Sequence, residues 1–197
     1  MSEAQSLVID FTTGAVAHRR QFGGGRGQAL PRAIGMKGGK TPFVVDATAG
    51  LGRDAFLLAS LGAHVTLIER SAKMHALLAD ALARAADSDV GEIIARMTLL
   101  HGDAKDLLAD LAPEVVLVDP MHPPRGKSAL VKKEMRLIRE IVGVDSDAPA
   151  LMKVALLAAR KRVVLKWPQK ADLMEGLPKP SHQITGKSTR YDVFMVG

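Results

Sequence analysis

The chain has 197 residues, 47% of them hydrophobic and 24% charged, which is an ordinary globular composition and enough sequence to bury one core. Its 27 Lys and Arg residues outnumber its 21 Asp and Glu residues, and the formal net charge of +6 favours binding to a polyanion such as nucleic acid. The sequence has no Cys, which excludes disulfides and thiolate metal sites, and its six His residues show no metal-ligand spacing. Because it also lacks a long apolar run and a secretion signal, we expect a cytoplasmic protein without a membrane span or a bound metal.

The first 40 residues are Gly-rich, basic and poor in periodicity, so we predict that residues 1–40 form a segment packed on one domain of residues 41–197. From Thr41 onward, short runs rich in Val, Ile and Leu alternate with segments of helical periodicity, which predicts an α/β fold with a parallel sheet. The first five predicted strands cover residues 43–47, 64–69, 97–100, 114–119 and 162–166.

Helices are expected between these strands and a hairpin after them. Ser71 can cap a helix in which apolar residues recur at helical spacing from Met74 to Ala85. Two further strands, residues 182–187 and 191–196, have a short connection that forces them antiparallel. The other predicted helices cover residues 53–61, 127–141 and 148–159. The pattern therefore predicts a seven-stranded sheet that is mostly parallel and ends in an antiparallel hairpin.

A glycine turn directly after the first predicted strand is the clearest ligand-binding pattern. It contains Gly50 and Gly52, and glycines at such a strand-to-helix turn let the backbone approach a ligand closely. Glu69 ends the second strand, where a carboxylate can accept hydrogen bonds from both ribose hydroxyls, and Asp103 follows the third strand, where it can meet an adenine edge. A glycine turn alone could be a turn without function, but these residues together predict a nucleoside-containing cofactor.

The details of this turn favour S-adenosylmethionine over a dinucleotide. A dinucleotide fingerprint has a third glycine, whereas Arg53 and Asp54 follow Gly52 here. Asp46, at the end of the strand, would repel a pyrophosphate but suits the ammonium of a methionine moiety. We therefore predict an adenosylmethionine site, with a NAD-dependent oxidoreductase as a weaker alternative.

An Asp-Pro pair, Asp119-Pro120, follows the fourth strand. Proline makes the turn rigid and aims the carboxylate into the cleft. Methylation of an exocyclic amine needs acceptors for the N–H bonds, because the nitrogen lone pair is delocalised into the ring. We predict that Asp119 and Pro120 are catalytic residues that orient such an amine; the alternative is a loop that only ends the strand.

Positive charge gathers in two segments, one near the N-terminus and one after the Asp-Pro turn. Their predicted RNA-binding residues are Arg19, Arg20, Arg26, Lys127, Lys132, Lys133 and Arg136. Cations of this kind bind phosphates and supply affinity with little sequence readout. Either segment alone could equally be a solvated surface.

Gly39-Lys40-Thr41 looks like the end of a phosphate loop. Ile34 stands where that motif requires its first glycine, and the segment precedes a predicted strand instead of following one. We therefore assign it no nucleotide site.

The motifs resemble those of a known family, the bacterial small-subunit ribosomal RNA guanine-N2 methyltransferases of the J type. The similar segments are Ala-His-Arg-Arg at 17–20, Phe-Gly-Gly-Gly-Arg-Gly at 22–27, Asp-Ala-Thr-Ala-Gly-Leu-Gly-Arg-Asp at 46–54, Asp-Pro-Met at 119–121 and Lys-Ser-Ala-Leu-Val-Lys-Lys-Glu-Met-Arg at 127–136. The resemblance runs from about Asp10 to the C-terminus. It implies a Rossmann-like class I methyltransferase fold, S-adenosylmethionine as donor, and the N2 amine of one guanine in 16S rRNA as acceptor. By position it implies cofactor contacts at Arg53, Asp54, Glu69, Arg70, Asp103, Ala104 and Asp119.

The chain departs from the family pattern in two places. Family members usually carry an extra segment ahead of Val8, so we expect a smaller RNA-holding surface here. Amine methyltransferases often place an aromatic residue after Asp-Pro-Pro, whereas this chain has Met121 and His122. Stacking on the base therefore falls to His122 or to a residue elsewhere in the chain, and we assign the contact with the base to His122. Two other functions stay open: a methyltransferase with a protein, small-molecule or other RNA acceptor, and a catalytically inactive RNA-binding module on the same scaffold.

Overall fold

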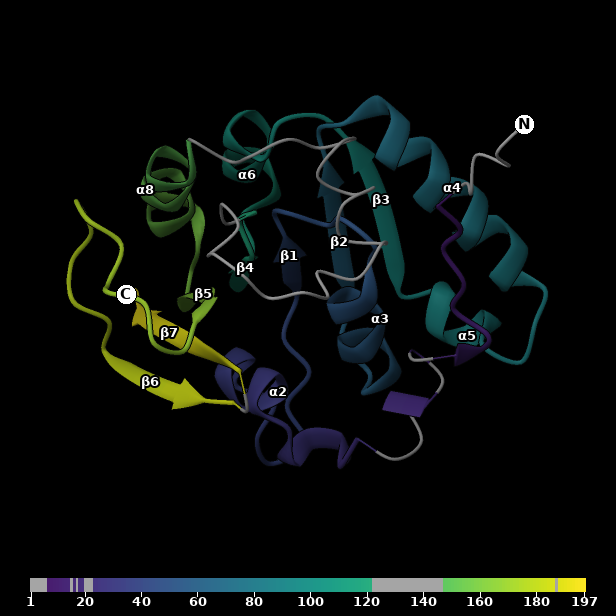
Figure 1. Cartoon of the computed structure of the whole chain (residues 1–197), viewed down its shortest axis with the longest axis horizontal. Coiled ribbons are helices and arrows are strands. Elements are labelled where there is room, and N and C mark those ends of the chain that lie inside the picture. Colours follow the sequence, from purple (N-terminus) through teal and green to yellow (C-terminus); the bar gives the residue numbers. More distant parts are fainter. Residues whose placement is uncertain (1–6, 15, 17, 20–22, 122–146, 187) are drawn as a thin grey trace, which may run out of the picture.

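A seven-stranded sheet forms the centre of the molecule, with the strand order β3-β2-β1-β4-β5-β7-β6 (Figure 1). The computed structural model describes residues 7–14, 16, 18–19, 23–121, 147–186 and 188–197. The strands are β1 Val44–Asp46, β2 Val65–Glu69, β3 Met97–His101, β4 Val115–Val118, β5 Arg162–Pro168, β6 His182–Thr185 and β7 Thr189–Met195. β1 to β5 pair in parallel, and β7 pairs antiparallel with both β5 and β6. This confirms the predicted seven-stranded α/β fold with its antiparallel C-terminal hairpin.

Helices cover both faces of the sheet, which explains why β1, β2 and β4 are buried along their whole length. Leu58 of α3 and Met74 of α4 belong to the apolar core on one face, and Leu108 of α6 and Met152 of α8 belong to the core on the other. The described helices are α2 Ala29–Ile34, α3 Arg53–Ser60, α4 Ala72–Ala86, α5 Gly91–Ile94, α6 Ala104–Leu111 and α8 Ala148–Ala158, with a 3₁₀ turn η1 at Gly25–Gly27. As predicted, the Ser71 hydroxyl caps α4 by accepting a hydrogen bond from Met74 N at 3.4 Å.

Two details differ from the sequence prediction, and one predicted helix is not tested. The helices α2, α5 and α6 were not predicted; α2 and α5, with six and four residues, give too little periodicity to recognise. β5 extends to Pro168, which pairs with Thr189 at the end of the strand, where a missing N–H is tolerated. The predicted helix 127–141 lies outside the described residues.

The N-terminal segment contributes to the core in spite of its Gly-rich composition. Phe11 is buried and stacks on Phe56 of α3, with ring centroids 5.1 Å apart. Leu30 and Ile34 of α2 are buried in the same core.

None of the helices in the described part of the chain combines the length and apolar character that a membrane span requires.

Candidate active site

A cavity of about 280 Å³ opens at the C-terminal ends of the parallel strands β1, β2 and β4. This is the edge at which open α/β sheets bind their ligands. The cavity brings together most of the predicted cofactor residues, namely Asp46, Gly50, Arg53, Asp54, Glu69, Arg70, Asp103, Ala104 and Asp119. Their roles in binding stay predictions.

The two glycines of the turn have different surroundings. Both have positive φ, 52° at Gly50 and 67° at Gly52, a conformation that favours glycine. A Cβ at Gly52 would lie 3.0 Å from Leu78 and 3.1 Å from Phe11, so this glycine lets α3 begin close to the core. At Gly50 the nearest atom to a Cβ would be Thr48 O at 3.8 Å, and Gly50 lines the cavity. Gly52, unlike Gly50, therefore has a packing role.

Glu69 joins the end of β2 to the glycine turn. Its side chain is 4% exposed, and it accepts hydrogen bonds from Gly50 N at 3.0 Å and from Ser71 N at 2.8 Å. Each carboxylate oxygen has two lone pairs, so these bonds do not exhaust its acceptor capacity. A carboxylate fixed in this way at the cavity wall suits the two hydroxyls of a ribose.

Asp103 and its neighbours form the end of the cavity beside β3. Asp103 caps α6 by accepting a hydrogen bond from Lys105 N at 2.9 Å. Lys105 also forms an ion pair with Asp147, and Arg70 Nη1 lies 3.1 Å from both carboxylate oxygens of Asp147. Hydrogen bonds from Lys105 and Arg70 hold the pKa of Asp147 below its usual range. Sequence reasoning missed Asp147, whose only local signal is its position directly before α8.

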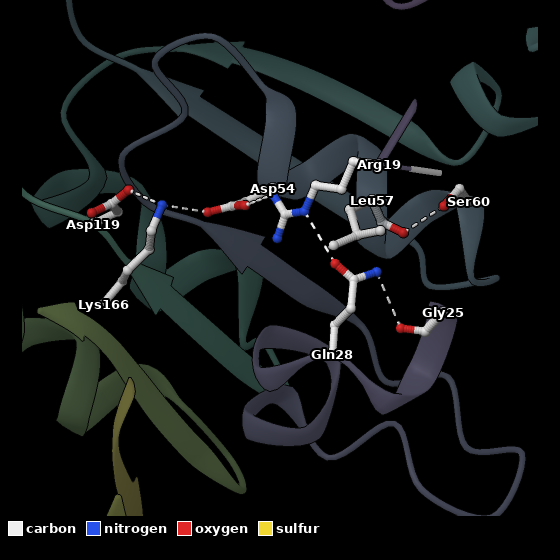
Figure 2. A network of polar contacts seen from close by, with 8 residues as sticks. All are labelled: Arg19, Gly25, Gln28, Asp54, Leu57, Ser60, Asp119 and Lys166. Atoms are coloured by element: carbon white, nitrogen blue, oxygen red, sulfur yellow. Dashed lines mark hydrogen bonds and ion pairs between the residues drawn. The ribbon is translucent and has the colours of Figure 1, made fainter. Parts of the chain in front are cut away.

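A chain of alternating charges crosses the cavity wall from β4 to the N-terminal segment (Figure 2). Lys166 Nζ lies 2.7 Å from Asp119 Oδ2 and 2.8 Å from Asp54 Oδ2. Arg19 Nη1 lies 2.6 Å from the other oxygen of Asp54, and Arg19 Nε donates to Gln28 at 3.2 Å. Lys166 was not selected from the sequence because a lysine at the end of a predicted strand belongs to no motif.

Mutual pairing keeps this chain ionised. Burial raises the pKa of Asp54, but the cations Lys166 and Arg19 outweigh it and hold that pKa below its ordinary value. Burial lowers the pKa of Lys166, but the negative charges of Asp119 and Asp54 outweigh it and raise that pKa well above its ordinary value. Lys166 therefore stays protonated at neutral pH.

Asp46 has a different environment. It is 3% exposed, lines the cavity, and accepts one hydrogen bond from Thr48 N at 3.2 Å. Burial, with the added negative charges of Asp54 and Asp119, raises the pKa of Asp46 from 3.8 to about 7. A buried carboxylate at a cavity wall is a good partner for a ligand with a positive charge, which fits adenosylmethionine.

Within the described ranges, no group of three or more His, Asp or Glu side chains could hold a metal ion.

Of the predicted catalytic residues, Asp119 lines this cavity. Asp119 N donates to the Thr48 hydroxyl at 2.7 Å, which connects the Asp-Pro turn to the glycine turn. Pro120 is buried directly after it, and Met121 lines the cavity. His122 lies outside the described residues.

The predicted RNA-binding residues are only partly described. Arg19 lies in the cavity wall, paired with Asp54. Arg26 donates to the backbone oxygens of Lys40 at 2.9 Å and Leu61 at 2.8 Å. Their contacts with RNA stay predictions, and the other members of the set, Arg20, Lys127, Lys132, Lys133 and Arg136, lie outside the described residues.

The sheet order and the cavity define an S-adenosylmethionine-dependent methyltransferase. A family model for SAM-dependent methyltransferases matches residues 1–196. The crystal structure of a SAM-dependent methyltransferase from Neisseria gonorrhoeae has a TM-score of 0.76 and 35% identity, over 99% of this chain and 76% of that chain. The glycopeptide N-methyltransferase MtfA complexed with S-adenosylmethionine has a TM-score of 0.50 and 21% identity, over 100% of this chain and 71% of that chain, which supports the fold alone.

More narrowly, the chain belongs to the ribosomal RNA small subunit methyltransferase J family. It is 70% identical over 195 residues to that methyltransferase from Brucella anthropi, covering 98% of this chain and 95% of the relative. It is 64% identical over 194 residues to the Agrobacterium fabrum protein, covering 98% and 93%. The protein of the same name from Pseudomonas aeruginosa is 57% identical over 190 residues, with 94% of this chain and 72% of the relative covered. These relatives confirm the family resemblance inferred from the motifs.

Proposed function

We propose that this protein transfers the methyl group of S-adenosylmethionine to the exocyclic N2 amine of a guanine in 16S rRNA. Relatives that are named as small-subunit rRNA methyltransferases support the RNA class. The observation that carries the proposal is the position of Asp119, whose carboxylate is held by Lys166 at 2.7 Å beside the cofactor cavity. That position is where an acceptor for the amine N–H bonds is needed.

The cavity offers a partner for each part of the donor. Glu69 would accept hydrogen bonds from the ribose hydroxyls, Asp103 would meet the adenine edge, and Asp46 would face the methionine ammonium. When bound, the cofactor supplies a methyl group on a positively charged sulfur. Arg53, Asp54, Arg70 and Ala104 line the same cavity and would complete its wall.

Asp119 and the backbone of Pro120 would orient the guanine amine for direct displacement. With the N–H bonds accepted, the nitrogen lone pair can form a bond to the methyl carbon as the carbon–sulfur bond breaks. The amine then loses a proton to Asp119 or to water, so no general base of unusual pKa is required. Holding nitrogen, carbon and sulfur in line can contribute roughly 7–11 kcal/mol of the barrier reduction. In this proposal His122 contacts the base.

The RNA partner in this proposal is 16S rRNA, either free or in the small ribosomal subunit, in the cytoplasm. The basic residues of the N-terminal segment and of residues 127–136 would bind its phosphates. The net charge of +6 supports such a partner, because neutralised phosphates release condensed counterions.

Nucleoside analysis after labelling tests the proposal directly. The protein is incubated with methyl-labelled adenosylmethionine and 16S rRNA that lacks N2-methylguanine, as naked RNA and as assembled subunit. Label in N2-methylguanosine supports donor, acceptor and atom together. If the protein binds adenosylmethionine but both RNA forms stay unlabelled, the rRNA assignment is wrong.

A further inference from the structure

A second hollow, of about 860 Å³, opens at the N-terminal ends of β4 and β5, the sheet edge opposite the cofactor cavity. Its walls come from α2, the connection from α2 to β1, and the first residues of β4 and β5. The charged residues among the described residues that line it are Arg32, Lys37, Lys40, Lys161, Arg162 and Glu114. We call this surface the basic hollow.

Internal pairing neutralises only part of the charge of the basic hollow. Glu114 is its one acidic residue among those described; it forms an ion pair with Lys161 and accepts a hydrogen bond from Phe43 N at 2.8 Å. Arg162 donates to Ala33 O at 3.2 Å. The remaining cations, Arg32, Lys37 and Lys40, are exposed and have no ion-pair partner within the described part of the chain. The basic hollow therefore presents unneutralised positive charge to solvent.

A glycine turn places two of these cations on the rim. Lys40 N donates to Lys37 O at 3.3 Å, which closes the turn Lys37-Gly38-Gly39-Lys40. Gly38 and Gly39 have φ of 61° and 81°, which side chains other than glycine rarely adopt. This is the Gly-Lys-Thr segment to which no nucleotide site was assigned, and it precedes β1 as expected. Its lysines thus belong to the basic hollow and not to a phosphate loop.

The basic hollow is connected to the active site through α3. Arg26 binds both Lys40 O, on the rim, and Leu61 O, at the C-terminal end of α3. Arg53, the first residue of α3, lines the cofactor cavity. A helix of eight residues spans about 12 Å. One folded RNA can therefore reach both the basic hollow and the cofactor cavity.

We propose that the basic hollow binds backbone phosphates of the RNA substrate, so that RNA contacts extend from the active site to the opposite edge of the sheet. This inference rests on the proposed function. The spread of exposed cations around a wide hollow suits a polyanion, whose affinity comes from release of counterions at several phosphates. A small anion would instead need donors that converge on one point.

The test compares two double variants that remove the same charge. Lys37→Gln with Lys40→Gln changes the basic hollow; Lys153→Gln with Lys179→Gln changes exposed lysines that do not line it. Binding of 16S rRNA is measured from about 50 to 200 mM salt, together with RNA methylation and adenosylmethionine binding. We expect the first variant to lose about one unit of salt slope per lysine and to raise the KM for RNA about tenfold at low salt. Its kcat at saturating RNA and its affinity for adenosylmethionine should match the wild type.

Two results would overturn the inference: a salt slope and KM like those of the wild type, or an equal loss in the Lys153 and Lys179 variant, which would assign the effect to net charge. If the wild type methylates 16S rRNA and the Lys37 and Lys40 variant does so equally well, only this inference fails. If the wild type binds adenosylmethionine but neither binds nor labels 16S rRNA, the proposed function fails and this inference with it.

Discussion

Lys166 holds Asp119 across the ends of two neighbouring strands, with 2.7 Å between Nζ and Oδ2. The Asp119 side chain is 38% exposed, so without Lys166 it can turn toward solvent. The same ammonium binds Asp54 at 2.8 Å, which fixes Lys166 in turn. Lys166 thus acts as a positioning residue for the carboxylate that we expect to orient the substrate amine.

Substitution Lys166→Met should lower kcat for RNA methylation about 100-fold, the cost typical of a misplaced reacting group. Adenosylmethionine binding should weaken much less, because Asp54 keeps its partner Arg19. Lys166→Arg keeps the charge and should recover part of kcat. Single-turnover rates and calorimetric binding separate the two effects; equal losses in rate and cofactor affinity would point to a purely structural role for Lys166.

Asp119→Ala should abolish most turnover while the protein still binds adenosylmethionine. The expected loss is about 100- to 1,000-fold in kcat, as for removal of one preorganised hydrogen-bonding group from an active site. Asp119→Asn keeps one acceptor oxygen and should retain more activity than the alanine variant. Methylation of 16S rRNA by Asp119→Ala at a near-normal rate would remove Asp119 from the mechanism.

Asp46 should make the cofactor-free protein less stable as pH rises. Its pKa is about 7 in the folded protein and 3.8 in the reference state, so between these values the folded state retains a proton that the unfolded state releases. Stability from this group is therefore full below about pH 4 and is lost as pH rises toward 7. Asp46→Asn removes the titration and should stabilise the cofactor-free protein by roughly 1–4 kcal/mol at pH 8, less at pH 5. Thermal unfolding of both proteins at the two pH values checks this, and a constant difference would contradict it.

The same carboxyl group should make cofactor binding depend on pH. If ionised Asp46 faces a positively charged part of adenosylmethionine, the cofactor binds more tightly as Asp46 loses its proton. The affinity of the wild type should therefore rise between about pH 6 and pH 7.5, near the pKa of Asp46 at about 7. Asp46→Asn should bind more weakly and with a flatter profile. Calorimetric titrations across this range provide the measurement; identical profiles would place Asp46 away from the charge of the cofactor.

The strands and the glycine turn could be predicted because each carries its signal locally. Continuous apolar runs identified the buried strands, and Glu69 and Asp103 could be selected because Glu69 ends β2 and Asp103 follows β3, two strands whose ends meet at one edge. These predictions needed only the rule that parallel strands share their C-terminal edge.

The ion pairs that complete the cavity could not be predicted, because they join residues far apart in sequence. Lys166 and Asp119 are 47 residues apart, and Arg70 and Asp147 are 77 apart. Arg19 illustrates the same limit. Its basic neighbourhood gave no sign of the ion pair with Asp54 that the structure shows in the cavity wall, and its contact with RNA stays a prediction. Local charge patterns do not say which carboxylate a cation will meet after folding.

Arg190 should contribute strongly to stability, because it forms a buried ion pair with Asp192 on β7. The two residues are 7% and 1% exposed, and Arg190 Nε lies 2.9 Å from Asp192 Oδ1. Its guanidinium also donates to the backbone oxygens of Gln169 at 3.1 Å and Asp172 at 3.3 Å, which holds the segment after β5 against β7. Arg190→Met leaves the Asp192 carboxylate buried without its cation, and we expect a loss of about 3–5 kcal/mol in the free energy of unfolding.

For a chain of this size that loss corresponds to a decrease of roughly 10 °C in Tm. Arg190→Lys keeps a positive charge but cannot reach the same set of carbonyl oxygens, so its Tm should fall between those of the wild type and the methionine variant. Arg190 pairs with Trp167 in the sheet, next to Lys166. A shift of this end of β5 would move Lys166, so Arg190→Met should also lose RNA methylation activity at temperatures below its Tm. A Tm near that of the wild type would instead show that the ion pair contributes no more than the apolar packing that replaces it.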